Sequence, residues 1–251
     1  MFPTLVLAAA FAGPLLSTVT VGGSCDQTCP SGRLVVGAGE IVGRRPDGWL
    51  VVLTARHVVE KMAEPSVYLR EEETPGERFS ELWLARDGRT ASVIAEASDA
   101  DLALVSFRPR AADAYAVAKL VSGGTPDSGD VIGDPNGEMW IASPFHFLES
   151  ASDTYVVECS TCGPGDSGGG VFDDSGRLAG ILIKQRVDPS KIVDGEAAGT
   201  TQFQVVAAAK VRAFLASTAQ PWMGGASPAT DPRDRGVWAR FDAMRGDVTL
   251  H

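Results

Sequence analysis

The sequence predicts an all-β protein, and three observations support this fold class. Short apolar runs recur along the chain between residues 34 and 212. Glycine, proline, aspartate and asparagine separate these runs, as they do at turns between short strands. Helical periodicity is scarce, and its clearest case lies at residues 205–217. Many short strands at regular spacing are typical of β-barrels and β-sandwiches.

The expected elements can be placed along the chain. The expected strands are residues 34–43, 49–54, 66–69, 81–85, 92–95, 102–107, 154–158, 169–172, 178–183 and 201–206. Residues 205–217 are rich in alanine and predict a helix that closes the strand-rich part. Residues 122–138 and 187–200 are expected to be loops, and residues 218–251, with several prolines and charges, a C-terminal tail.

The first 24 residues are expected to be a signal peptide or an uncleaved apolar arm. An apolar stretch runs from Leu5 to Leu16, which is too short for a membrane-spanning helix of about 20 residues. The small residues Ala10 and Ala12 flank Phe11 as at a signal-peptidase site, although no basic residue precedes the stretch. The sequence therefore favours a secreted or periplasmic protein without stable membrane insertion.

The overall charge limits the possible partners. The chain of 251 residues carries a formal net charge of −10. An acidic surface repels nucleic acid, so we expect no nucleic-acid partner. We expect the protein to be a monomer.

The four cysteines form two close pairs, Cys25 with Cys29 and Cys159 with Cys162. In an exported protein, disulfides within each pair are the simplest arrangement. Two such pairs could instead bind zinc tetrahedrally, or remain as free thiols.

Three apolar runs each carry one reactive side chain. His57 follows the run WLVVLT, Asp101 precedes the run LALVSF, and Ser167 lies in the glycine-rich stretch GPGDSGGG. A serine hydroxyl needs a base to remove its proton, and an imidazole needs a carboxylate to orient it. Asp99, two residues before Asp101, is the alternative carboxylate. Glycines beside a serine can expose backbone N–H groups, so Gly165 and Ser167 are candidates for an oxyanion hole.

Together the motifs TARHV (54–58), DLALV (101–105) and GDSGG (165–169) resemble those of the trypsin/chymotrypsin-like serine proteases. The resemblance covers roughly residues 33–217. It implies two six-stranded antiparallel β-barrels with a C-terminal helix, in a protease domain over residues 25–217 whose barrels divide near residues 115–125. It also implies a catalytic triad of His57, Asp101 and Ser167.

The chain departs from the family pattern in several places. No IVGG sequence precedes the first strand, and GAGEIVG (37–43) instead resembles the GSGF motif of bacterial relatives of the high-temperature-requirement kind. Gly170 stands where proline is common in the family.

The resemblance also indicates where a substrate side chain would bind. It places Thr161 at the floor of the specificity pocket and Ile183 and Gln185 along its wall. None of these residues is charged, so we expect cleavage after a small or medium uncharged residue.

The sequence thus predicts a serine endopeptidase of polypeptides that needs no cofactor or metal. It contains neither the HExxH motif of zinc hydrolases nor the GxxxxGK[ST] motif of a phosphate-binding loop. The alternatives are a catalytically inactive binding or adhesion protein on the same scaffold, and an intracellular or viral processing protease with the same chemistry.

Overall fold

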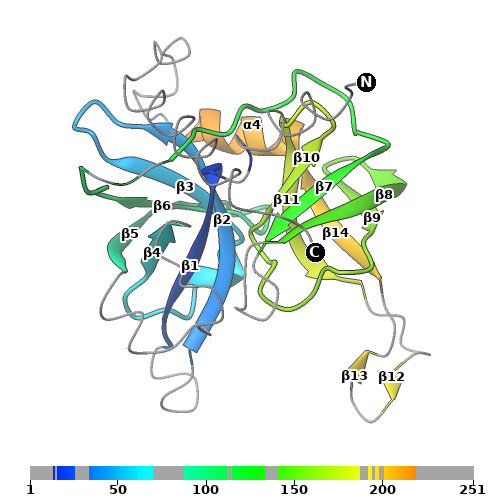
Figure 1. The fold of residues 1–251 in the computed structure, drawn as a ribbon, viewed down its shortest axis with the longest axis horizontal. Coiled ribbons are helices and arrows are strands. Elements are labelled where there is room, and N and C mark those ends of the chain that lie inside the picture. The colour runs from blue at the N-terminus through cyan, green and yellow to red at the C-terminus, as the bar shows by residue number, and fades with distance from the viewer. Residues whose placement is uncertain are drawn as a thin grey trace, which may run out of the picture.

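The computed structural model describes residues 14, 16–25, 34–69, 88–111, 113, 115–133, 141–186, 192–193, 196–197 and 201–218. These residues form two closed, six-stranded antiparallel barrels and a C-terminal helix, which confirms the predicted fold class. Figure 1 shows the first barrel, coloured from blue to blue-green, beside the second, coloured from green to orange-yellow.

The first barrel has the strand order β1-β2-β3-β6-β5-β4. Its strands are β1 (Thr18–Ser24), β2 (Leu34–Arg44), β3 (Leu50–Thr54), β4 (Ser66–Leu69), β5 (Arg89–Glu96) and β6 (Ala103–Phe107). The short helix α2 (Arg56–Val59) follows β3. Every residue of β3 and β6 is buried, which agrees with their continuous apolar sequence.

The second barrel has the strand order β10-β11-β14-β9-β8-β7. Its strands are β7 (Ser128–Gly133), β8 (Ile141–Ala151), β9 (Thr154–Glu158), β10 (Gly170–Asp173), β11 (Leu178–Gln185) and β14 (Gln202–Ala207). The two-residue strands β12 (Ile192–Val193) and β13 (Glu196–Ala197) pair with each other within the expected loop 187–200. Helix α4 (Ala208–Ser217) follows β14 and lies near both barrels (Figure 1).

The two barrels share one apolar core. The cluster that fills the first barrel, with Val52 and Leu104 among its buried members, continues into Phe172 and Ile181 of the second barrel and Phe214 of α4. A second cluster around Tyr155 and Phe203 fills the interior of the second barrel. Because this apolar cluster spans the seam between the barrels, residues on either side of it hold fixed relative positions.

The N-terminal boundary of the domain differs from the expected one. Residues 18–24 were expected in the signal peptide or arm, but they form β1, which pairs with both β2 and β4. Val19 and Val21 are completely buried in the barrel, and Leu16 accepts a hydrogen bond from the Ala116 amide. The folded domain therefore begins before residue 17 and not at residue 25, because removing β1 would open the barrel and expose two strand edges.

Two further expectations need correction. Residues 122–138 were expected to be a loop, but β7 occupies 128–133, because pairing with β8 and β10 outweighs the low strand propensity of Ser128, Gly129 and Asp130. The helix expected from residue 205 begins at Ala208, because residues 205–207 pair in β14. The expected strand 81–85 and the tail beyond Thr218 lie outside the described residues.

Candidate active site

His57 lies on the short helix α2, directly after the buried strand β3. Val58 and Val59 are 2% and 3% exposed and anchor the helix in the core of the first barrel. The His57 side chain is 41% exposed and lies on the open side of the same turn. The sequence of this short helix therefore supplies both the buried valines that anchor it and the exposed imidazole.

Asp101 contacts His57 at two points. Its Oδ2 lies 2.6 Å from His57 Nδ1, and its Oδ1 accepts a hydrogen bond from the His57 backbone amide at 2.9 Å. Burial opposes ionisation of this carboxyl group, but the hydrogen bonds from His57 outweigh burial and lower its pKa. An ionised Asp101 accepts the Nδ1 proton, which leaves Nε2 as the proton acceptor of the imidazole.

Asp99, the alternative carboxylate, has a different partner. Lys210 of α4 donates to its Oδ2 at 2.6 Å and also lies 3.1 Å from Asp153 in the turn between β8 and β9. The hydrogen bond from Lys210 lowers the pKa of Asp99. Sequence reasoning left Lys210 unassigned, because its partners come from distant parts of the chain.

Residues 163–169, which we call the serine loop, are held by both barrels. The Ser167 carbonyl accepts a hydrogen bond from the Ala38 amide of β2 at 2.8 Å. The Gly168 amide donates to Leu182 of β11 at 2.7 Å. Within the loop, the Gly163 amide donates to the Asp166 side chain at 2.8 Å. Ser167 is therefore positioned by strands from both sides of the seam.

Gly168 allows the close approach of the serine loop to the first barrel. Its φ is +90°, and a Cβ there would lie 2.0 Å from the Ala38 oxygen and 2.4 Å from Thr54 Oγ1. Thr54 ends β3, three residues before His57. The glycine thus brings the loop against the residues that lead into α2.

The Ser167 hydroxyl is directed toward β11. Its Oγ lies 3.5 Å from the carbonyl oxygen of Ile183, and no hydrogen bond between Oγ and the His57 ring occurs among the described residues. Ile183 lies between Leu182 and Lys184, where the pairing of β11 with β14 is irregular. Catalytic hydrogen bonds are often long without a substrate.

The backbone amides of Gly165 and Ser167 remain available as donors. Within the part of the chain that the structure describes, no group accepts a hydrogen bond from either amide. Backbone amides without an internal acceptor can donate to an oxyanion.

The residues expected to form the specificity pocket lie in two segments. A disulfide joins Cys159 to Cys162 and encloses the exposed Thr161. Ile183 is 6% exposed and Gln185 is partly exposed, both on β11. The structure brings the Ile183 backbone next to Ser167, whereas no described contact links Thr161 to it.

Disulfide bonding was one of three alternatives for the cysteines. Cys25 is also disulfide-bonded, and Cys29, the other member of its expected pair, lies outside the described residues. Within the described ranges, no three His, Cys, Asp or Glu side chains gather as a metal site requires. The structure thus contains the Cys159–Cys162 disulfide and not a zinc site at these two positions.

Sequence reasoning also missed Glu40, a completely buried carboxylate of β2. Ser17 Oγ, Thr18 Oγ1 and the Gly170 amide donate to it at 2.9, 2.8 and 2.9 Å. Burial raises the pKa of Glu40 to about 8, although the three hydrogen bonds oppose this shift. A carboxylate within an otherwise apolar strand was the available signal.

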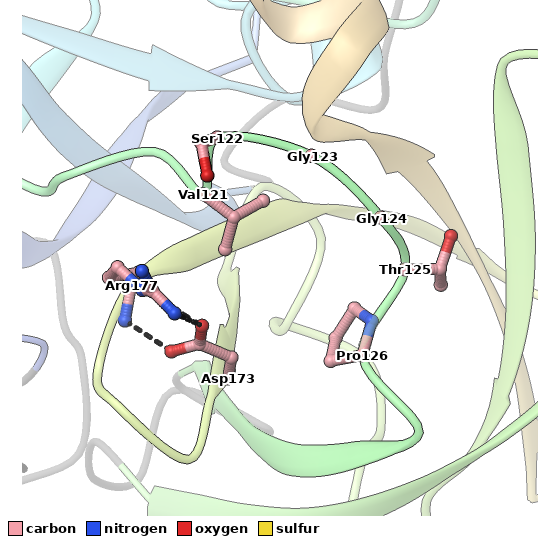
Figure 2. Close-up of a pocket in the computed structure, with 8 residues that line it drawn as sticks. All are labelled: Val121, Ser122, Gly123, Gly124, Thr125, Pro126, Asp173 and Arg177. Atoms are coloured by element: carbon pink, nitrogen blue, oxygen red, sulfur yellow. Dashed lines mark hydrogen bonds and ion pairs between the residues drawn. The ribbon is translucent and has the colours of Figure 1, made fainter.

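One described pocket, of about 110 Å³, lies apart from these residues. Residues 121–126 line it together with Asp173 and Arg177, and Figure 2 shows these two side chains paired with each other. It includes none of the candidate catalytic residues, so we do not count it as part of the site.

Among the residues that the structure describes, no helix is both long and apolar enough to cross a bilayer.

Comparison with known proteins gives one family match. A family model of the trypsin-like peptidase domain matches residues 37–181, more than half of the chain. A search of curated protein sequences finds no match.

Several solved structures have a similar fold. The active form of the Rv3671c protease from M. tuberculosis has a TM-score of 0.61 and 20% sequence identity, over 91% of this chain and 89% of that chain. The serine endoprotease from Yersinia pestis has a TM-score of 0.61 and 16% identity, over 88% of this chain and 69% of that chain. The HtrA-type protease AlgW, with a tripeptide, has a TM-score of 0.62 and 17% identity, over 86% and 64%.

Proposed function

Because the chain belongs to the trypsin-like peptidase family, we propose that it is a serine endopeptidase that cleaves polypeptides through an acyl-enzyme on Ser167. The observation that carries the proposal is the two-point contact of Asp101 with His57. The serine loop lies close by, since Gly168 packs against Thr54 and Ala55, just before His57.

Acylation would begin when Ser167 Oγ attacks the carbonyl carbon of the scissile bond. His57 Nε2 takes the hydroxyl proton, and Asp101 stabilises the imidazolium that forms. The amides of Gly165 and Ser167 donate to the oxyanion of the tetrahedral intermediate. When the C–N bond breaks, His57 returns the proton to the leaving amine and Ser167 remains acylated.

Deacylation would repeat these roles with water as the nucleophile. His57 removes a proton from water as the oxygen attacks the ester carbonyl, and then protonates Ser167 Oγ as the ester bond breaks. Free enzyme and a new carboxylic acid result, and the acid then releases its proton to the solvent. Neither half-reaction needs a metal or cofactor.

For specificity, we propose a preference for a small or medium uncharged residue before the scissile bond. Thr161, Ile183 and Gln185 would line the pocket, and none of them can neutralise a charged side chain. Peptide-library profiling tests this, and a profile dominated by arginine, lysine or glutamate would contradict it.

We further propose that the enzyme works outside the cytoplasm. The apolar segment before residue 17 and the disulfide between Cys159 and Cys162 support this proposal. Cleavage after Ala12 would leave β1 intact, whereas cleavage at residue 24 would remove it. Intact-mass analysis of the exported protein would identify its mature N-terminus.

The decisive test compares wild type, Ser167→Ala and Ser175→Ala in fluorophosphonate labelling and peptide hydrolysis. Ser175 is an exposed serine in the turn between β10 and β11, so it serves as the matched control. We expect Ser167→Ala to lose labelling and hydrolysis and Ser175→Ala to retain both. Equal hydrolysis by Ser167→Ala and wild type would reject the mechanism, and a folded wild type that does not label would favour an inactive binding protein.

A further inference from the structure

Glu40 lies where the N-terminal part of the chain, the first barrel and the serine loop meet. It is on β2, opposite Thr18 of β1 in the strand register. Its carboxylate also reaches Gly170, the first residue of β10 in the second barrel. Gly170 is three residues after Ser167, so Glu40 contacts the end of the segment that carries the proposed nucleophile.

Two residues of β2 hold this segment. The Ala38 amide donates to the Ser167 carbonyl at 2.8 Å, and two residues later the Glu40 carboxylate accepts from the Gly170 amide at 2.9 Å. Both residues belong to β2, so both contacts depend on the position of this strand. Together they set the position of Ser167 relative to the first barrel, which carries His57.

The contact needs a backbone N–H at position 170. Proline has no N–H and could not donate to Glu40. A Cβ at Gly170 would also lie 2.7 Å from Glu40 Oε1 and 2.4 Å from the Phe172 ring. A glycine at position 170 therefore provides both the N–H that Glu40 accepts and the space that the Glu40 side chain occupies.

We propose that Glu40 is a positioning residue for Ser167, which acts by fixing the Gly170 amide at the end of the serine loop. The proposal rests on the proposed endopeptidase function, because it explains how Ser167 is held for attack. Ser17, which precedes β1, and Thr18, the first residue of β1, hold the carboxylate from its other side, so both become part of the same support.

The hydroxyl groups of Ser17 and Thr18 indicate which side chains position 40 can accept in place of glutamate. Ser17 Oγ and Thr18 Oγ1 lie 3.0 and 2.9 Å from the Pro14 carbonyl, so each hydroxyl has a second acceptor within reach. A glutamine at position 40 can donate to Ser17 while its oxygen still accepts from Gly170. Leucine, of similar size, offers no acceptor to Gly170.

The experiment measures fluorophosphonate acylation, kcat, KM and Tm for Glu40→Gln, Glu40→Leu and wild type, with Asp113→Asn as the control at another buried carboxylate. We expect Glu40→Leu to lower the acylation rate and kcat by about 10-fold or more, as a buried N–H without an acceptor should, with little change in KM. Glu40→Gln should stay within about 3-fold of wild type, because it keeps the acceptor. Asp113→Asn should lower Tm without changing the acylation rate of the folded protein.

Two outcomes would overturn the proposal. One is wild-type acylation by folded Glu40→Leu. The other is an equal loss of acylation and Tm in Glu40→Gln and Glu40→Leu, which would indicate a purely structural role. If Glu40→Leu does not fold, Glu40→Met, which also offers no strong acceptor to the Gly170 amide, carries the test, and unchanged acylation in that variant would then overturn the proposal.

Hydrogen exchange measured by mass spectrometry separates this inference from the proposed function. The peptide spanning residues 163–172 should exchange faster in Glu40→Leu than in Glu40→Gln or wild type. This readout does not require catalysis. If wild type fails to label but Glu40→Leu still exchanges faster than the other two proteins, the endopeptidase function is rejected and the positioning role of Glu40 is retained. Equal exchange in all three proteins would reject the positioning role itself.

Discussion

At the scale of single residues, Asp101 and Asp99 have similar local sequence but different surroundings. Asp101 accepts from both the backbone and the ring of His57, whereas Asp99 pairs with Lys210. The lowered pKa of each carboxyl group has a separate cause, His57 for one and Lys210 for the other. Only Asp101 is placed to orient an imidazole.

Asp101→Asn tests this assignment, with Asp99→Asn as the matched control. We expect Asp101→Asn to lower kcat by about 10⁴-fold, because an amide favours the wrong imidazole tautomer and cannot stabilise the imidazolium. Asp99→Asn should leave kcat within about 2-fold, because it affects only an exposed ion pair. Steady-state peptide hydrolysis measures both, and equal losses in the two variants would contradict the assignment.

Gly168 is a second residue whose role can be tested. In Gly168→Ala, the added methyl group would overlap the Ala38 carbonyl, and φ of +90° is unfavourable for alanine. We expect a loss of about 1–3 kcal/mol in unfolding free energy and a large loss of fluorophosphonate labelling. Gly163→Ala is the control, since no atom lies within 4 Å of its added Cβ. Tolerance of alanine at position 168 would show that the serine loop is not held against β2.

At the scale of secondary-structure elements, a buried ion pair joins the start of β5 to the chain after β6. Arg89 donates to Asp113 through two nitrogens, at 2.6 and 3.2 Å, and the two side chains are only 5% and 6% exposed. The Arg110 amide also donates to Asp113. This ion pair therefore fixes the position of the chain where it leaves the first barrel.

Asp113→Ala should destabilise the protein by about 3–5 kcal/mol, because it leaves Arg89 buried without its carboxylate. The exposed pair of Arg177 and Asp173 supplies the comparison, and Arg177→Ala should cost less than about 1 kcal/mol. Urea denaturation of both variants measures the difference. Similar losses would mean that burial does not determine the strength of these pairs.

The strands that were predicted and those that were missed differ in sequence. β3 and β6 are continuous apolar runs between turn residues, and their local pattern was sufficient. β7 contains Ser128, Gly129 and Asp130, and becomes a strand only by pairing with β8 and β10. β1 was assigned to the N-terminal segment because its apolar residues extend a stretch that resembles an export signal.

At the scale of the whole molecule, the candidate site depends on the seam between the barrels. His57 and Asp101 belong to the first barrel and Ser167 to the second, while the shared apolar core holds the barrels together. Glu40 lies in this seam and accepts hydrogen bonds from both sides. Its protonation therefore affects the stability of the whole fold.

Stability should fall as pH rises, because of Glu40. Folding raises its pKa from 4.5 to about 8, so the folded protein holds a proton that the unfolded chain releases between these values. The contribution of Glu40 to unfolding free energy should therefore decrease from pH 4.5 to about 8 and stay constant above that. Urea denaturation across this range should show a shallower decline for Glu40→Gln, and parallel profiles for the two proteins would contradict the prediction.

The sequence by itself determined the fold class, the family and the candidate residues His57, Asp101 and Ser167, because each lies in a short motif beside a strand with a clear apolar pattern. The roles of these three residues stay a prediction. Only the tertiary structure decided that β1 closes the first barrel, that Lys210 pairs with Asp99, and that Glu40 reaches Gly170. Glu40 and Gly170 are 130 residues apart and meet only when both barrels have closed, so no local pattern could place them together.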